Sequence, residues 1–290
     1  MNHFYPATTL ALALSQAGTA LAENPYLEEV FVTSSRIEMP LRQVGTSVSV
    51  VTREKIQQRG FNSLHDILRS QPSIGVTNAG GAGKATSLRI RGEESYRTLV
   101  LLDDIDISDT STPQVTPRME HLLSSGIQRV EILRGPQGLM YGADAGGVVN
   151  ITTVRQTDGL AGQVSAEGGR YGSQQFAGNL GWGNETIDVN VSAADFQTDG
   201  FNARTTDQDL RDDDGYDNTT LHGRFGWNVS EDLRLSLVAR NVDGDTDYDG
   251  CFNPDTFASS NRCKDEFEQD IWRVAGDYQW GRFSHQGFYS

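Results

Sequence analysis

The sequence predicts a compact α+β domain followed by the first strands of an antiparallel transmembrane β-barrel. Helix signals alternate with short strands up to Thr153 and then cease. From there, segments of about ten residues alternate apolar and polar side chains, as a wall between lipid and water requires. A soluble β-sandwich would also alternate, but its inner positions are rarely so small and so rich in glycine. The barrel is therefore favoured.

The first residues predict an exported protein. An apolar stretch over residues 7–22 ends in Ala20-Leu21-Ala22, the pattern of a signal-peptide cleavage site. Because no Lys or Arg precedes this stretch, a short buried helix is the alternative. No other run approaches the ~20 apolar residues of a membrane-spanning helix. We expect a signal peptide over 1–22 and any membrane-embedded part to be a β-barrel.

Residues 23–45 are expected to form a linker with one short β-prone segment, residues 29–33. Such a strand either joins a sheet of its own domain or is offered to the sheet edge of a partner.

The α+β domain is expected over residues 46–153. Strands are predicted at 47–51, 87–92, 98–107 and 127–133, and helices at 53–59, 63–70 and 119–126. Thr52 and Gly60 would bound the first helix. Ser63 and Asp66 have the spacing of a capping box for the second. His65 lies off the apolar face of that helix and is expected to be solvated.

The barrel strands are expected over residues 154–290. Ile187, Val189 and Val191 alternate with Asp188 and Asn190, and residues 221–229, 232–240 and 271–280 alternate in the same way. Short links at 183–185 and 230–232 contrast with long acidic segments at 198–217 and 243–268. Only about seven strands fit, whereas a barrel enclosing a domain of ~100 residues needs about twenty-two. We therefore expect an incomplete barrel, the front part of something longer.

The charge is concentrated in the second half. Residues 1–150 carry 15 Asp and Glu against 13 Lys and Arg, so the other 24 acidic and 11 basic residues follow residue 150. A net charge of −15 without clustered cations argues against nucleic-acid binding. A cation or a cationic ligand fits this charge better.

The two cysteines, Cys251 and Cys263, lie twelve positions apart in a polar segment. In an exported protein a disulfide is favoured over a metal pair, since no CxxC motif or neighbouring His accompanies them.

No catalytic motif is complete. The segment GGAGKAT has Asn78 where a phosphate-binding loop needs its first glycine, and Ala85 follows Lys84. The HExxH and GxSxG motifs do not occur. We expect no enzyme, and no redox or nucleotide cofactor.

Three stretches resemble the TonB-dependent outer-membrane receptors, and among them the vitamin B12 receptors most closely. They are LRIRG (88–92), LVLLDDIDI (99–107) and QRVEILRGPQGLMYGADAGGVVNITT (128–153), in the order and spacing of that family. The resemblance implies that residues 46–153 are a plug domain inside the barrel. It also implies that the glycine-rich stretch is the last plug strand and its passage into the first barrel strands.

The resemblance assigns roles to particular residues. Residues 29–33 correspond to the TonB box, which a periplasmic TonB-type energy-coupling protein captures by strand addition; its members are Glu29, Val30, Phe31, Val32 and Thr33. Arg91 and Arg134 belong to motifs whose arginines hold plug to barrel, although pairing inside the plug with Glu131 is an equal alternative. Loops 78–86 and 108–117 would face the ligand, and their candidate contacts are Asn78, Lys84, Asp109 and Thr110.

The acidic loops predict calcium. Carboxylates at alternate positions beside glycine suit Ca²⁺, although no complete EF-hand loop occurs. The vitamin B12 receptors bear calcium-binding loops at this point of the chain. The expected ligands are Asp212, Asp214, Asp247 and Asp249.

The resemblance implies an active-transport receptor in the Gram-negative outer membrane, surrounded by lipid. Its expected ligand is cobalamin, with a ferric siderophore as the alternative. A truncated, non-transporting remnant with unpaired sheet edges is the other alternative.

Overall fold

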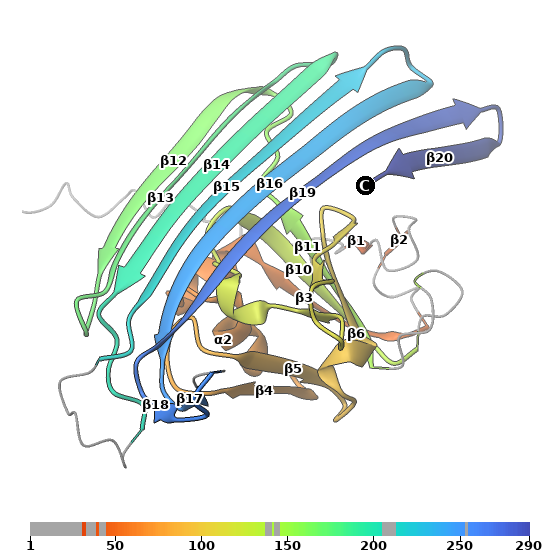
Figure 1. Cartoon of the computed structure of the whole chain (residues 1–290). Helices are drawn as coiled ribbons and strands as arrows, with labels where there is room; N and C mark the ends of the chain where they lie inside the picture. Colours follow the sequence, from red (N-terminus) through yellow and green to blue (C-terminus); the bar gives the residue numbers. More distant parts are fainter. Residues whose placement is uncertain are drawn as a thin grey trace, which may run out of the picture.

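The structure, a computed structural model, describes residues 31–32, 39–40, 45–136, 141, 146–204, 213–252 and 255–290. A small α+β domain lies against the concave side of a curved antiparallel sheet (Figure 1). The predicted fold class is confirmed, because the helices precede the curved sheet and strands alone build that sheet in the described residues. None of the described helices is long and apolar enough to cross a membrane.

A five-stranded sheet in the order β3-β10-β11-β6-β7 forms the centre of the α+β domain. Strands β11 and β6 are parallel, and every other pair is antiparallel. The strands are β3 (Ser47–Thr52), β6 (Thr98–Leu102), β7 (Ile105–Asp106), β10 (Ile127–Arg134) and β11 (Gly147–Thr153). Val100, Ile132, Val149 and Ile151 are fully buried in one core cluster, which explains the apolar runs of this part of the sequence.

Two short helices pack on this core. Helix α1 (Arg53–Arg59) ends at Gly60, whose left-handed φ of 61° lets its N–H donate to the Gln57 carbonyl. Helix α2 (Leu64–Arg69) buries Ile67 and Leu68 in the core cluster. Both helices were predicted. The capping box was not formed, because the Ser63 side chain makes no capping hydrogen bond.

The prediction of a solvated His65 is wrong. His65 is 3% exposed, and its Nδ1 lies 3.3 Å from the Met119 carbonyl oxygen. The segment around Met119 folds over α2 and covers a face that the helix period alone marks as polar. That segment is also not the predicted helix over 119–126, since only Met119–His121 form a 3-10 turn.

Further short strands complete the domain. They are β4 (Ile74–Asn78) paired with β5 (Thr86–Ile90), and β8 (Ser108–Asp109) paired with β9 (Thr116–Pro117). Before the domain, β1 (Phe31–Val32) pairs with β2 (Met39–Pro40) in a separate two-stranded sheet. The sequence did not predict β4. Residues 98–107 were predicted as one strand but form two, because Asp103 and Asp104 turn the chain with φ of 47° and 66°.

The curved sheet holds the seven strands expected from the sequence, each antiparallel to its neighbours. They are β12 (Gly159–Gly168), β13 (Gln174–Gly183), β14 (Ile187–Thr198), β15 (Tyr216–Asn228), β16 (Leu233–Tyr248), β19 (Cys263–Trp280) and β20 (Phe283–Tyr289). Residues 147–153 belong to the domain sheet as β11, so the passage into the curved sheet starts after Thr153 rather than inside the glycine-rich stretch.

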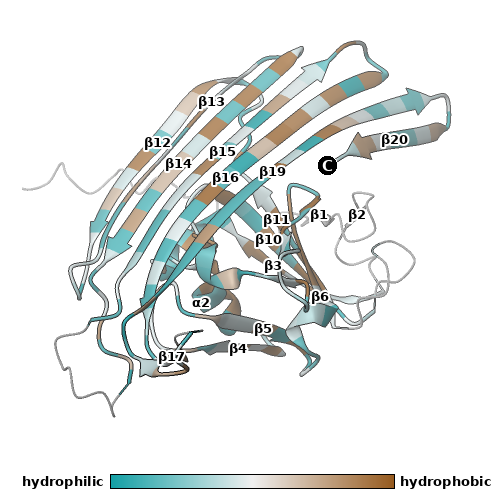
Figure 2. Cartoon of the chain, viewed as in Figure 1, coloured by the Kyte–Doolittle hydropathy of each residue, from teal (hydrophilic) through white to brown (hydrophobic). Residues whose placement is uncertain are grey.

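Side chains on the two faces of the curved sheet differ as predicted. Bands of apolar and polar residues alternate along its strands (Figure 2). Leu160 and Val164 on the convex face are 71% and 86% exposed, whereas Asp188 and Asn190 on the concave face are buried. An exposed apolar face of this extent is what lipid contact requires.

Short turns join the strands at one end of the sheet and longer loops at the other. The prediction of a loop over 243–268 is wrong, because β16 and β19 extend far into it and leave only residues 249–262 between them. This connection contains β17 (Cys251–Phe252) and β18 (Ser259–Ser260), and a disulfide joins Cys251 to Cys263.

Candidate functional site

A cavity of about 550 Å³ lies where the α+β domain meets the loop end of the curved sheet. The β4–β5 loop of the domain forms one wall, and residues from the β14–β15 and β16–β19 connections form the other. Its charged lining residues are Lys84, Arg118, Arg204, Asp214, Asp249 and Asp265. Three cations thus face three carboxylates, so the described lining of the cavity carries no surplus charge.

Asn78 shapes the β4–β5 loop. Its Nδ2 donates to the Gly81 carbonyl and to Thr86 Oγ1, both at 2.9 Å, while its Oδ1 accepts from the N–H groups of Gly80 and Gly81 at 2.8 Å each. These bonds occupy the side chain that was expected to contact a ligand. Asn78 therefore holds the loop conformation instead of facing the cavity with free donors.

Glycine lets this loop approach the curved sheet closely. Gly83 has φ of 71°, and a Cβ there would lie 2.1 Å from Cδ2 of the buried Tyr216 ring. A Cβ at Gly80 would lie 2.8 Å from the Cβ of Ala203. A side chain at Gly83 would displace the loop from its seat on Tyr216, so glycine is required for the contact itself.

Lys84 fixes the same loop to the end of the connection between β14 and β15. Its side chain is only 4% exposed, and Nζ donates to the carbonyls of Asp214 and Gly215 at 3.0 and 3.1 Å. Burial lowers the pKa of the ammonium group, and the carboxylates of Asp214, Asp247 and Asp249 oppose this shift. Lys84 lines the cavity, as expected of a ligand-binding residue, but its donors are directed to the protein.

Arg118 connects the two parts of the protein beside the cavity. It donates to Glu120 Oε1 and to Asp265 Oδ2 of β19, both at 2.6 Å, and its guanidinium lies 5.3 Å from the Phe267 ring centroid. Burial raises the pKa of the Glu120 carboxyl, although the charge of Arg118 opposes this shift. Sequence patterns did not indicate this residue, because its partners come from distant segments.

Asp109 and Thr110, the other two predicted ligand contacts, differ in burial. Asp109 is buried, and its Oδ1 accepts from the Ser111 N–H and hydroxyl at 2.8 and 2.6 Å. Burial raises the pKa of Asp109, but these bonds and the charge of Arg118 outweigh it, so the pKa is lowered. Thr110 is exposed. Neither residue lines the cavity.

A second buried contact holds the domain to the curved sheet. Asp103 accepts from His222 Nε2 at 2.9 Å, from Arg224 Nη1 at 2.7 Å and from Thr153 Oγ1 at 2.6 Å. Burial raises the pKa of Asp103, but the hydrogen bond from His222 and the charge of Arg224 outweigh it and lower the pKa. Sequence reasoning missed this site as well.

The described hydrogen bonds of Arg91 and Arg134, the two arginines expected to join plug and barrel, lie within the α+β domain. Arg134 Nε donates to the Pro72 carbonyl at 2.9 Å, inside the domain, and Arg91 is exposed. Among the described residues neither makes an ion pair with the curved sheet. Glu131, the alternative partner, pairs with Arg129 at 2.9 Å.

The expected metal ligands are only partly described. Asp212 lies outside the described residues, Asp214 is buried, and Asp247 lies at the end of β16, with its N–H donating to the Gly215 carbonyl at 3.1 Å. Asp249 lines the cavity. In the described parts of the chain, no group of three or more His, Cys, Asp or Glu could hold a metal ion.

The expected signal peptide over residues 1–22 and the predicted TonB-box residues Glu29, Val30 and Thr33 lie outside the described residues. Phe31 and Val32 form β1, paired with Pro40 and Met39 of β2.

Comparisons with known proteins match this architecture. The TonB-dependent Receptor Plug Domain family matches residues 40–149. The vitamin B12 transporter BtuB of Photobacterium profundum is 32% identical over 257 residues, which cover 84% of this chain and 41% of that protein.

Solved structures share the fold. The siderophore receptor PirA from Acinetobacter baumannii has a TM-score of 0.65 at 19% identity, over 83% of this chain and 39% of PirA. The ferric enterobactin receptor PfeA from Pseudomonas aeruginosa has a TM-score of 0.66 at 20% identity, over 84% of this chain and 40% of PfeA. The chain thus spans about two fifths of the length of these relatives.

Proposed function

Because this chain belongs to the TonB-dependent receptors of the Gram-negative outer membrane, we propose that it forms the plug and part of the barrel wall of an active importer. The plug is the α+β domain of residues 46–153, and the curved sheet is the wall, with lipid on its convex face. The ligand would bind without covalent chemistry in the cavity between the β4–β5 loop and the outer loops. The energy would come from a periplasmic TonB-type protein that captures residues 29–33 by strand addition.

Cobalamin is the ligand that we propose. Sequence identity of 32% to a vitamin B12 transporter is the single observation that carries this proposal. The charge of the cavity supports it, because three cations face three carboxylates in its described lining, whereas a strongly anionic ferric chelate would be favoured by a surplus of cations. The likeness to siderophore receptors concerns the fold alone, at 19% and 20% identity. A ferric siderophore remains the second candidate because Lys84, Arg118 and Arg204 line the same cavity.

Direct binding separates the two ligands. Isothermal titration of the purified receptor with cyanocobalamin and with ferric enterobactin should give saturable heat with the first probe alone. Lys84→Met should weaken binding by about one to two orders of magnitude, because hydrogen bonds from a charged donor contribute roughly 1.5–3 kcal/mol to holding the cavity wall. Lys55→Met, on the exposed side of α1, is the matched control. Binding of ferric enterobactin in place of cyanocobalamin would contradict the proposal.

We also propose that calcium orders the outer loops around the cavity. Asp214 precedes β15, Asp247 lies near the end of β16, and Asp249 follows β16 and lines the cavity. Asp212, the fourth expected ligand, lies two positions before Asp214 in the sequence. Carboxylate oxygens beside glycine are ligands that Ca²⁺ prefers.

A further inference from the structure

The plug is held unequally by the strands around it. Buried or charged contacts tie it to β15, β16 and β19: Asp103 to His222 and Arg224, Arg118 to Asp265, and Gly83 to Thr246. On the other side, in the described residues, no ion pair joins the plug to β12 or β13. There two hydrogen bonds reach one side chain, Gln163 of β12, from Arg53 and from Gln57, and Ala177 of β13 packs against the apolar cluster that includes Leu123 of the plug.

A polar crevice occupies the weakly held side. One cavity of about 250 Å³ lies between α1 and the inner faces of β12 and β13, and a second of about 430 Å³ adjoins it further toward the linker that enters β12. The two share the lining residues Arg53, Gln57, Gln163 and Asn179. They therefore form one crevice along the plug.

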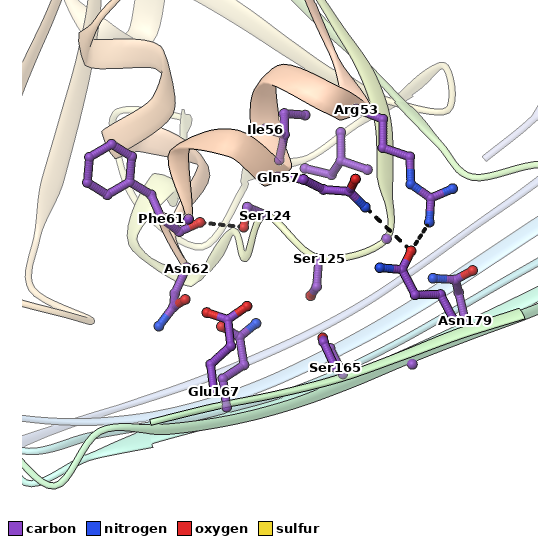
Figure 3. Close-up of a pocket in the computed structure, with 17 residues that line it drawn as sticks. Arg53, Ile56, Gln57, Phe61, Asn62, Ser124, Ser125, Ser165, Glu167 and Asn179 are labelled. Carbon is purple, nitrogen blue, oxygen red and sulfur yellow. Dashed lines mark hydrogen bonds between the residues drawn. The ribbon is translucent and has the colours of Figure 1, made fainter. Parts of the chain in front are cut away.

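The chemistry of the crevice is mainly amide and hydroxyl. Ser165, Glu167 and Asn179 point from the curved sheet toward the plug, while Gln57 and Asn62 face them from the plug (Figure 3). Arg53 is the one cation among the described residues that line it. Such a lining offers many neutral donors and acceptors, which a bulky solute with amide and hydroxyl groups can exchange for water at little cost. Few contacts need to break for α1 to move away from β12 and β13.

We propose that the imported ligand passes the plug through this crevice, between α1 and strands β12 and β13, while the plug stays attached to β15, β16 and β19. The proposal rests on the proposed function, since it assigns a route to the import of a neutral, amide-rich ligand. Tension on the segment before β3 would act first on β3, which pairs with β10, and next on α1, which follows β3 directly.

Cross-linking tests the route. Gln57→Cys/Gln163→Cys, whose native side chains lie 3.4 Å apart, is bridged across the crevice with a short bifunctional thiol reagent. The matched pair Asp104→Cys/Arg273→Cys, 3.8 Å apart in the native protein, is bridged across the attached side. Cells that express each receptor are then assayed for uptake and surface binding of radiolabelled cyanocobalamin, with single-cysteine variants treated in the same way.

The crevice bridge is expected to abolish uptake while binding is retained, and the bridge on the attached side is expected to leave uptake intact. Uptake through the bridged crevice would overturn the proposal. Equal loss with both bridges would also overturn it, because it would mean that the plug moves as a whole. A wild-type receptor that imports no cyanocobalamin counts against the proposed function instead, and this is seen before any bridge is made.

A steric pair gives an independent test without cross-links. Ser165→Trp places a large ring in the crevice, whereas Val164→Trp places the same ring on the convex face, where Val164 is 86% exposed. The first variant is expected to lose uptake at unchanged binding, and the second to keep both. Equal uptake by the two variants would overturn the proposed route.

Discussion

Asp103 of the plug and His222 of the curved sheet lie 2.9 Å apart, between Oδ2 and Nε2, with side chains 1% and 3% exposed. The same carboxylate receives Arg224 and Thr153. A buried carboxylate with this many donors is costly to replace, because each donor would lose its partner out of reach of water. Asp103 thus marks where the plug is fixed to its wall.

Replacing Asp103 should loosen the plug. Asp103→Asn leaves Arg224 without its buried counter-charge, and we expect a loss of about 3 kcal/mol in the free energy of unfolding. Asp104→Asn is the matched control, since the Asp104 side chain is 57% exposed and 3.8 Å from Arg273. Guanidinium denaturation of the receptor in detergent measures both. Equal denaturation midpoints for the two variants would contradict the role of Asp103.

His121 should make plug stability depend on pH. Burial, and then the charge of Arg118, lower the pKa of His121 from 6.5 to about 4. The folded protein thus keeps the ring neutral while the unfolded chain binds a proton, so stability is complete above pH 6.5 and falls as the pH drops toward 4. The loss should approach roughly 3 kcal/mol. His121→Asn should flatten the pH profile of the denaturation midpoint, and His285→Asn, at an exposed histidine, should not. A wild-type profile without this decline would refute the prediction.

Gly83→Ala should displace the β4–β5 loop from Tyr216. The added Cβ would lie 2.1 Å from the Tyr216 ring, and overpacking of this kind costs roughly 1–3 kcal/mol beyond backbone strain. Gly92→Ala is the control, because Gly92 also has positive φ, 83°, but its Cβ would meet nothing within 4 Å. We expect weaker cyanocobalamin binding for Gly83→Ala alone. Unchanged affinity in both variants would show that the loop does not shape the cavity.

Calcium binding is tested by calorimetry on the receptor after chelation. We expect saturable uptake of Ca²⁺ that is reduced in the double variant Asp212→Asn/Asp214→Asn. The control, Asp195→Asn, removes a carboxylate of β14 that accepts from Thr219 Oγ1 at 3.0 Å. Absence of calcium uptake by the wild-type receptor would contradict the proposal that the outer loops bind calcium.

The two parts of the fold were predicted from the sequence with different success. Alternation over residues such as Val189 and Asn190 indicated the curved sheet, because period-2 burial follows directly from strand geometry. The same rule extends through Asp243, Asp245 and Asp247, which lie on β16 although their charge suggested a loop. The strands of this sheet extend beyond their apolar segments. In these extensions the residues are mostly polar, so composition did not predict a strand there.

The site was harder to predict. Lys84 was identified in a glycine-rich loop and lies in the cavity wall. Arg118, His121 and Asp103 were missed, because each acquires its role from partners on β15 or β19, far along the chain. His65 shows the same limit, since Met119 buries it from 54 positions away. Local patterns specify elements, but contacts between them come from the tertiary arrangement.

Energy-coupled uptake of radiolabelled cyanocobalamin tests the central claim most directly. In cells that express the receptor, Val30→Pro removes a backbone N–H from the segment expected to pair with the TonB-type protein, while Val30→Thr keeps it and a β-branched side chain. We predict that the proline variant binds cyanocobalamin at the cell surface but accumulates none, and that the threonine variant does both. Equal accumulation by the two variants, or no binding by the wild-type receptor, would contradict the claim that this protein is a TonB-driven importer of cobalamin.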